Sequence, residues 1–264
     1  MGAEARFTRD IYKRTKGFIV NWPLGRQLEL GDLIRLPATR GQSFELQGRL
    51  AEYGIEIVSE PDLTSDDELW TSTYKVDVET DVAAEVNTSV AKVGAGLNLG
   101  FGRKGSYVFQ PRHVTYDRVY NLAEVRRQIS RRLPRDEWVP RLAVVTEVVL
   151  AESYALLLSE SRDANVRIFV EGKPSLSISE LAEPKLKGSL KVERSEKQVT
   201  TLIGASGGVV GFRAHRIKRL QLDNRTDSGP QSFDDDEAMS FELVPLADDE
   251  LEALLGIDED EDES

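Results

Sequence analysis

The sequence contains no cysteine and only two histidines in 264 residues. Without cysteine, disulfide bonds, thiolate zinc sites and S-acylation are excluded. His113 and His215 show no metal-ligand spacing, so we expect both to be structural or surface residues, and we expect no metal or other cofactor. Catalytic motifs are missing as well. Residues 204–208 lack the G-x-S-x-G pattern, and residues 94–100 lie within a β alternation, so we expect no enzyme.

Long apolar runs are also missing. No stretch approaches the ~18 consecutive apolar residues that a transmembrane helix requires. Residues 1–16 carry charges throughout, so we expect no signal peptide. Arg6 stands where a myristoylation signal requires Ser or Thr. These absences predict a cytoplasmic protein.

Negative charge is concentrated at the C-terminus. Residues 223–264 hold 17 acidic side chains against one basic, so the rest of the chain carries a net charge of +4 within a total of −12. Such a tail is typical of a solvated, solubilising segment. The more specific alternative is an intramolecular mask over a basic surface that binds a polyanion.

A long period-2 pattern runs from Tyr74 to Val90, where every even-numbered residue is apolar or small. It extends for about 17 residues, roughly three times a usual strand. After Lys92 the parity shifts, and apolar residues through Phe101 alternate with small ones. The pattern predicts a long amphipathic hairpin or a pair of hairpins.

Two interpretations of these hairpins remain open. A soluble antiparallel sheet with one wet face alternates in this way. A transmembrane β-barrel hairpin does too, and it needs about 9–11 residues in each strand. Five glycines between Gly94 and Gly105 weaken any single packed conformation, which favours a region that can be remodelled.

The N-terminal segment, residues 3–16, is predicted to form a short basic helix. Phe7 and Ile11 lie one turn apart among basic side chains, and Gly17 would end the helix. A basic helix suits an anionic membrane surface, but a plain surface helix has the same pattern.

A second basic helix is predicted over residues 121–133. Asn121 would cap it, Glu124 would complete a capping box, and Pro134 would close it. One face is an apolar stripe and the other carries four arginines.

Most other segments are predicted strands. Residues 142–158 read as a buried strand, because β-branched residues dominate its start, and residues 166–170 would return beside it as a hairpin. Residues 59–69 indicate a loop and residues 204–208 a glycine-rich turn. The predicted fold class is therefore α+β: a central twisted antiparallel sheet with long amphipathic hairpins and flanking basic helices.

The acidic C-terminal region divides into three parts. Residues 223–238 read as a linker, residues 239–243 alternate as a short strand, and residues 248–255 place leucines on one side of a small helix. A purely solvated tail has no use for these apolar residues. We therefore expect residues 239–255 to dock on the body, with residues 258–263 disordered.

The order of these elements resembles the gasdermin pore-forming domain. The resemblance covers residues 1–222 and includes the basic N-terminal helix, the phrase Leu28–Ile34, and the arm that enters residues 91–100. It continues through the arginine-rich helix, the apolar strand near residues 144–150, and the region 199–220.

The resemblance implies a pore-forming domain, residues 1–222, followed by the linker 223–238 and an autoinhibitory segment, residues 239–264. It implies a monomer in the cytoplasm that is held inactive until a protease removes the segment. The released domain would then bind anionic lipids of the inner (cell) membrane, form a homo-oligomer and insert β-hairpins, which causes cell death in anti-phage defence. Bacterial gasdermins often carry a lipid-modified cysteine near the N-terminus, and this chain has none.

The residues that this hypothesis assigns fall into four groups. The membrane-binding cations are Arg6, Arg9, Lys13, Arg14, Lys16, Arg126, Arg127, Arg131 and Arg132. The membrane-inserting residues are Val76, Val78, Val82, Val86, Val90, Leu97, Leu99, Phe101, Val144, Val148, Leu150, Val166, Ile168 and Val170. The autoinhibitory residues are Met239, Phe241, Leu243, Leu251, Leu254 and Leu255. Cleavage is expected at Arg225 by a trypsin-like protease or at Asp227 by a caspase-like one.

Two alternatives remain. The chain could be a soluble β-rich module that binds nucleic acid through its arginine-rich helix and last strand, with the tail as a mimic of phosphate charge. Its aromatic residues are few and are not interleaved with the basic ones, as base stacking requires. It could also be a structural protein with a merely solubilising tail.

Overall fold

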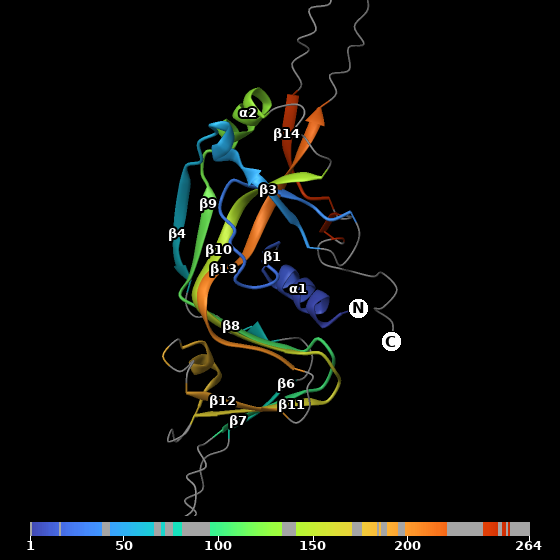
Figure 1. Cartoon of the computed structure of the whole chain (residues 1–264), viewed down its shortest axis with the longest axis vertical. Coiled ribbons are helices and arrows are strands. Elements are labelled where there is room, and N and C mark those ends of the chain that lie inside the picture. The colour runs from blue at the N-terminus through green and yellow to red at the C-terminus, as the bar shows by residue number, and fades with distance from the viewer. Residues whose placement is uncertain are drawn as a thin grey trace, which may run out of the picture.

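The computed structural model describes residues 2–15, 17–38, 43–65, 70–71, 76–80, 96–133, 141–170, 176–183, 185, 189–194, 199–220, 240–247, 250–251 and 253. This part of the chain forms an elongated molecule with two antiparallel sheets and two α-helices, α1 (Ala3–Arg14) and α2 (Leu122–Arg132) (Figure 1). The predicted α+β class with flanking basic helices is confirmed.

Two long strands form the spine of the larger sheet, which has ten strands. They are β10 (Leu142–Ser159) and β13 (Val199–Leu220), and they pair over almost their whole length. Along its other edge β10 pairs in turn with β2, β9 and β8. The remaining strands of this sheet are β1 (Ile19–Val20), β2 (Asp32–Arg35), β3 (Glu45–Arg49), β4 (Ser59–Ser65), β5 (Trp70–Thr71), β8 (Tyr107–Arg112), β9 (Val114–Val119) and β14 (Ser240–Pro245). Short 3₁₀ helices cover Leu50–Tyr53 and Ile178–Ala182.

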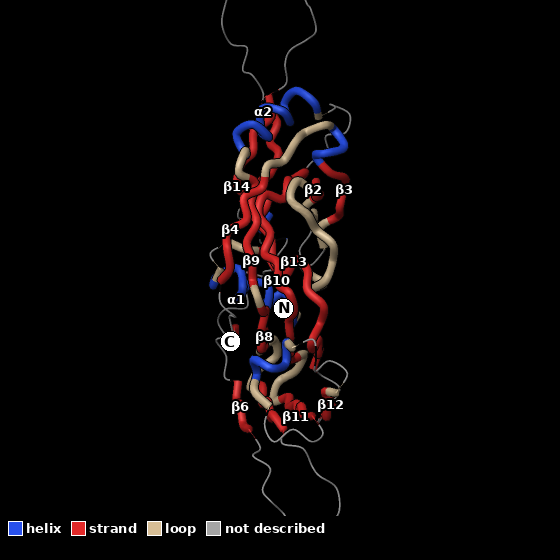
Figure 2. The backbone as a smooth tube through the Cα atoms, turned by 90° about the vertical axis from the view of Figure 1, so that its left-hand side faces the viewer, coloured by secondary structure: helices blue, strands red, loops and turns tan. Residues whose placement is uncertain are grey.

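The smaller sheet lies at the far end of the molecule from α2 (Figures 1 and 2). Its four strands are ordered β12 (Leu190–Arg194), β11 (Ala164–Val170), β7 (Gly96–Phe101) and β6 (Val76–Thr80). Val76 lies opposite Phe101 in the β6–β7 pair. The predicted hairpin between these two arms is therefore confirmed over the described residues, and its tip, residues 81–95, lies outside them.

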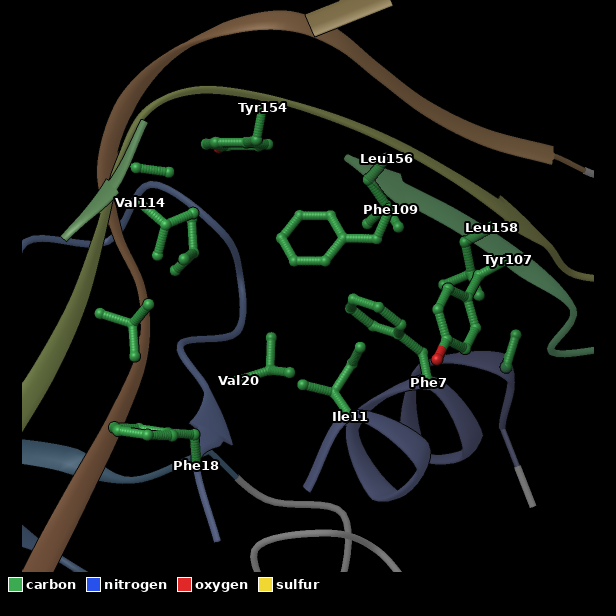
Figure 3. Close-up of a cluster of buried hydrophobic side chains, with 14 residues drawn as sticks. Phe7, Ile11, Phe18, Val20, Tyr107, Phe109, Val114, Tyr154, Leu156 and Leu158 are labelled. Atoms are coloured by element: carbon green, nitrogen blue, oxygen red, sulfur yellow. The ribbon is translucent and has the colours of Figure 1, made fainter. Parts of the chain in front are cut away.

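Helix α1 covers a cluster of buried side chains in the larger sheet. Phe7 and Ile11 point from the helix toward β8 and β10 (Figure 3). The Phe7 ring meets Tyr107 edge to face with centroids 4.8 Å apart, and it meets Phe109 at 5.6 Å. Aromatic pairs in this geometry add stability beyond their buried area. The apolar stripe expected from the sequence thus seats the helix on the sheet.

Helix α2 covers a second cluster near the start of β10. Val125 and Ile129 are fully buried there with Leu33, Val144 and Ile217. The helix begins after Asn121, as expected, but the predicted capping box is wrong. The Asn121 side chain donates to the Glu56 carbonyl and accepts from the Val58 amide, both at 3.0 Å. The same side chain that could cap the helix instead ties it to the loop that precedes β4.

Three other expectations are wrong, two about strands and one about a turn. Residues 59–65, predicted as a loop, form β4 on the edge of β9, where Glu60 pairs with Arg118 at 3.1 Å. Residues 164–170 do not pair with β10. They pair with β7 and β12, because the end of β10 is already flanked by β13 and β8.

The predicted glycine-rich turn at residues 204–208 is absent, because β13 continues through these residues as one strand. The reason is a close backbone approach. A Cβ atom at Gly207 would lie 2.0 Å from the carbonyl oxygen of Ala151 on β10. Glycine at this position allows two strands to touch rather than the chain to turn.

Candidate functional site

The C-terminal segment docks on the free edge of β13. Strand β14 pairs antiparallel with residues 215–220, so that Pro245 lies opposite His215 and Ser240 opposite Leu220. Figure 1 shows β14 beside the end of β13, next to α2. Docking of this segment, expected from its apolar residues, is confirmed for residues 240–247, 250–251 and 253.

Apolar side chains seat the segment on two core clusters. Leu243 packs against the cluster beneath α2. Leu246 and Leu251 pack against a neighbouring cluster that contains Phe212 and Ala214 of β13. Leu243 and Leu251 therefore make the contacts expected of a docked segment. The side chain of Phe241, together with Met239, Leu254 and Leu255, lies outside the described residues.

Two ion pairs join the segment to cations of the body. The Glu250 carboxylate, only 3% exposed, lies 2.7 Å from the Arg216 guanidinium of β13. Glu250 also accepts a hydrogen bond from the Ala247 amide at 3.0 Å, which caps its own helical turn. The second pair joins Glu242 to Arg126 of α2 at 2.8 Å. The segment thus neutralises one cation on the sheet and one on a basic helix.

A pocket of about 350 Å³ lies where the segment meets the body. Tyr12 and His215 line it from the body, and Leu246 and Leu251 line it from the segment. Thr146 Oγ1 lies 2.9 Å from His215 Nδ1. Burial lowers the pKa of His215, and the nearby Glu147 opposes this shift. His215 is therefore neutral at physiological pH in the docked state.

The predicted membrane-binding cations of α1 lie in two settings. Arg6 and Arg9 are half-buried, and Arg6 donates to the Lys104 carbonyl at 3.1 Å. Lys13 and Arg14 face solvent, and Arg14 lies 3.4 Å from Asp10. Lys16 lies outside the described residues.

A second contact of α1 fixes it to β8. The Tyr107 hydroxyl donates to Asp10 at 2.7 Å. Burial, followed by the bond to Asp10, raises the pKa of Tyr107, so its hydroxyl stays protonated. Sequence reasoning missed this bond because the two residues are almost one hundred positions apart.

The predicted cations of α2, in contrast, form an exposed face. Arg126, Arg127, Arg131 and Arg132 are all exposed. Arg127 pairs within the helix with Glu124 at 2.5 Å, and Arg132 donates to the Gly54 carbonyl. Of the four, Arg126 is paired with the C-terminal segment.

Six of the predicted membrane-inserting residues share one face of the smaller sheet. Strands β7 and β11 pair with Leu99 opposite Val166 and Leu97 opposite Ile168. All six are buried in a single cluster against the ends of β10 and β13. They are Leu97, Leu99, Phe101, Val166, Ile168 and Val170.

The other predicted inserting residues are divided. Val76 packs at the margin of the same cluster. Val144 belongs to the cluster beneath α2, while Val148 and Leu150 belong to the one beside Phe212, because a bulge after Val145 changes the parity of β10. The side chain of Val78 and residues Val82, Val86 and Val90 lie outside the described residues, as do the predicted cleavage residues Arg225 and Asp227.

Sequence reasoning missed the groups that anchor the segment, Arg216 and Glu250. They are separated by more than thirty residues, and each is one of many similar charges. The only sequence signal was the pairing of a cationic last strand with an acidic tail.

Within the described residues, neither helix has the length and apolar character needed to cross a bilayer, and no cluster of His, Asp or Glu is arranged to hold a metal ion.

Comparisons with known proteins found matches only among solved structures. No protein-family profile and no curated protein matches the sequence. The structure matches a bacterial gasdermin from Bradyrhizobium tropiciagri with 13% identity and a TM-score of 0.35, over 81% of this chain and 86% of that one. It also matches the gasdermin A3 membrane pore, determined by cryo-EM, with 12% identity and a TM-score of 0.30, over 87% of this chain and 97% of that one. Both are gasdermins, the family that the sequence resembles, and similarity this low carries no information about activity.

Proposed function

We propose that this chain is an autoinhibited pore-forming protein whose C-terminal segment masks the surface that acts on the membrane. The observation that carries the proposal is the double ion pair of the docked segment. Glu250 and Glu242 each pair with a cation of the body, and β14, which carries Glu242, covers the edge of β13. A segment with only a solubilising role would not bury a carboxylate in this way.

Release follows cleavage in the linker, residues 223–238, at Arg225 by a trypsin-like protease or at Asp227 by a caspase-like one. Once the covalent link is cut, the segment dissociates as a separate peptide. In the part of the segment that the structure describes, its contacts include one strand pair, three partly buried leucines and two ion pairs. Dilution then favours the open state, because the segment is no longer held at a high local concentration.

Membrane binding follows from the cations that the released body presents. Arg126 loses its partner and joins the exposed arginines of α2, while Lys13 and Arg14 face solvent from α1. Each Lys or Arg near an anionic surface contributes on the order of 1 kcal/mol of attraction. A handful of these residues is enough to recruit the body to anionic lipid.

Insertion uses the apolar face of the smaller sheet. Strands β6, β7, β11 and β12 bury this face against the body in the docked state. In a homo-oligomeric barrel the same valines and leucines face lipid, and every backbone group is paired because the barrel is closed. The protein then permeabilises the inner membrane and kills the cell in which it is made, as anti-phage defence requires. It needs no enzymatic activity to do so.

Dye release from vesicles tests this proposal. The full chain would carry an engineered protease site within residues 226–238 and be added to anionic vesicles, with and without the protease. We expect leakage only after cleavage, and only from vesicles that contain anionic lipid. The same chain with a scrambled protease site is the matched control. Absence of leakage from the cleaved and folded protein would refute the proposal, and salt-dependent binding to DNA or RNA would then support the nucleic-acid alternative.

A further inference from the structure

Five strands of the larger sheet lie side by side at the level of the C-terminal segment. Their order is β14, β13, β10, β2 and β3. Directly opposite residues form one row across them: Val244, Arg216, Ala143, Ile34 and Leu46. The two edges of the sheet at this level are therefore β14 and β3.

Strand β3 presents an exposed edge. Leu46 is 46% exposed, one of the few large apolar side chains of the described surface with this exposure, and Glu45 and Gln47 are exposed beside it. Among the described strands, β3 pairs only with β2. An open edge of this kind is a template for pairing with another chain. Strand β4, another edge, carries Pro61, a residue that protects edges from such pairing.

The directions of the strands make the two edges interchangeable. Each neighbouring pair in the row is antiparallel, so β14 and β3 run in the same direction. Suppose that a second copy places its β3 where β14 lies. The strands of its sheet then run in the same directions as those of the first copy, and the same face of the sheet points the same way. Such a contact is head-to-tail, and repeated contacts of this type form a ring when the rotation between neighbouring copies closes.

We propose that the edge of β13 left by β14 binds β3 of a second copy, so that the docked segment blocks assembly by occupying the assembly interface. This inference rests on the proposed release of the segment. Because the sheets of the two copies have the same orientation, the Leu46 side chain of the incoming strand lies on the face that carries Arg216 and Lys218. There it covers their aliphatic stems and loses its exposure to water.

Charge supports this choice of partner. Release of the segment removes Glu250 from Arg216 and Glu242 from Arg126, and Lys218 loses the strand opposite it. The incoming strand carries a carboxylate, Glu45, whose side chain lies on the opposite face from Leu46. This is the face covered by α2, where Arg126 has lost Glu242. Among the described residues, Glu45 makes a loose, exposed contact with Arg35 at 3.7 Å, so it is available for exchange.

Cross-linking between two single-cysteine chains tests the contact without background, because the protein has no cysteine of its own. One full-length chain would carry Leu46→Cys and a size tag, the other Lys218→Cys, and both an engineered protease site within residues 226–238. They would be mixed on anionic vesicles, cleaved, and treated with a short bis-maleimide, whose reach tolerates a shift in register. We expect the mixed dimer only after cleavage. Val58→Cys replaces Leu46→Cys in the matched control, since Val58 is also 46% exposed, and should give no product.

Dye release in the same samples separates this inference from the proposed function. Leakage without the mixed dimer overturns the strand exchange and leaves the pore-forming proposal standing. A mixed dimer without leakage supports the exchange and overturns pore formation, and the absence of both overturns both. As a second variant, Leu46→Lys places a charge against Arg216 and Lys218 and should abolish oligomers on the vesicles, while Val58→Lys should not. Equal oligomer yields from these two variants would contradict the proposal.

Discussion

Replacing Glu250 by glutamine should open the docked C-terminal segment without cleavage. The substitution removes one charge but keeps an oxygen that accepts the hydrogen bond from the Ala247 amide. The helical turn therefore stays capped. What is lost is the attraction between the carboxylate and Arg216, 2.7 Å apart.

The size of the effect follows from the exposure of the two partners. Glu250 is 3% exposed and Arg216 is 34% exposed. Breaking a fully buried pair costs about 3–5 kcal/mol, and an exposed pair contributes at most about 1 kcal/mol. Because one partner is buried and the other reaches water, we expect about 2 kcal/mol, or about a 25-fold increase in the open population. The more exposed pair of Glu242 and Arg126 should contribute only about 0.5 kcal/mol.

Hydrogen exchange of the amides in β14 and in residues 215–220 measures the opening free energy directly. A double-mutant cycle with Glu250→Gln and Arg216→Gln isolates the pair from the other effects of each change. A parallel cycle with Glu242→Gln and Arg126→Gln provides the internal comparison. Global stability, followed by urea unfolding, should change little in either series, because the segment lies at the edge of the sheet.

The reasoning fails if the two cycles give equal coupling energies, or if the exposed pair couples more strongly. It also fails if Glu250→Gln leaves exchange at residues 215–220 unchanged. In the first case the burial of Glu250 adds nothing to the strength of its ion pair. In the second case the charge of Glu250 has no part in docking, and the apolar packing of the leucines holds this part of the segment.

Three further predictions concern the body. Phe7→Ala should lower the free energy of unfolding in urea by about 3–5 kcal/mol, because it empties a fully buried site, whereas the exposed Lys13→Ala on the same helix should change it by less than about 0.5 kcal/mol. Gly207→Ala should prevent folding or lower the urea midpoint sharply, since its Cβ would lie 2.0 Å from a carbonyl oxygen of β10, while Gly2→Ala, with nothing within 4 Å, should be neutral. His215 has a lowered pKa in the folded state, so its contribution to stability is complete above the unfolded value of about 6.5 and is lost as the pH falls toward the folded pKa. The protection factors of the β14 amides, which correct for the pH dependence of intrinsic exchange, should fall over this range, and His215→Gln should flatten the profile.

Periodicity predicted the elements whose burial follows a simple repeat. The stripe of α2 buries Val125 and Ile129, and the described parts of the alternation, residues 76–80 and 96–101, appear as the paired β6 and β7. The β-branched start of β10 marked a strand buried on both faces. In each case the side chains of one segment alone determine which of its faces are buried.

The failures share a different cause, which is contact between distant segments. In the sequence Gly207 resembles a turn residue, but in the structure its place is explained by the carbonyl of Ala151, which leaves no room for a side chain. Residues 164–170 follow β10 in sequence, yet their partners come from residues 96–101 and 190–194. The same holds for the candidate site. The docking of the segment could be predicted from its leucines, but the pairing of Glu250 with Arg216 could not, because the chain contains many other arginines.

The length of β13 has a genetic consequence. Its 22 residues amount to roughly 70 Å of extended chain, with the β14-binding edge at one end and the cluster that buries the smaller sheet at the other. Under the proposed function, lesions at the two ends should therefore fall into separate phenotypic classes, one toxic without a trigger and one silent after it. A chain with a lesion at each end should be silent, because a defect in insertion is epistatic to a defect in restraint. A simple screen for survival could then order the steps of the pathway without any structure of the assembled form.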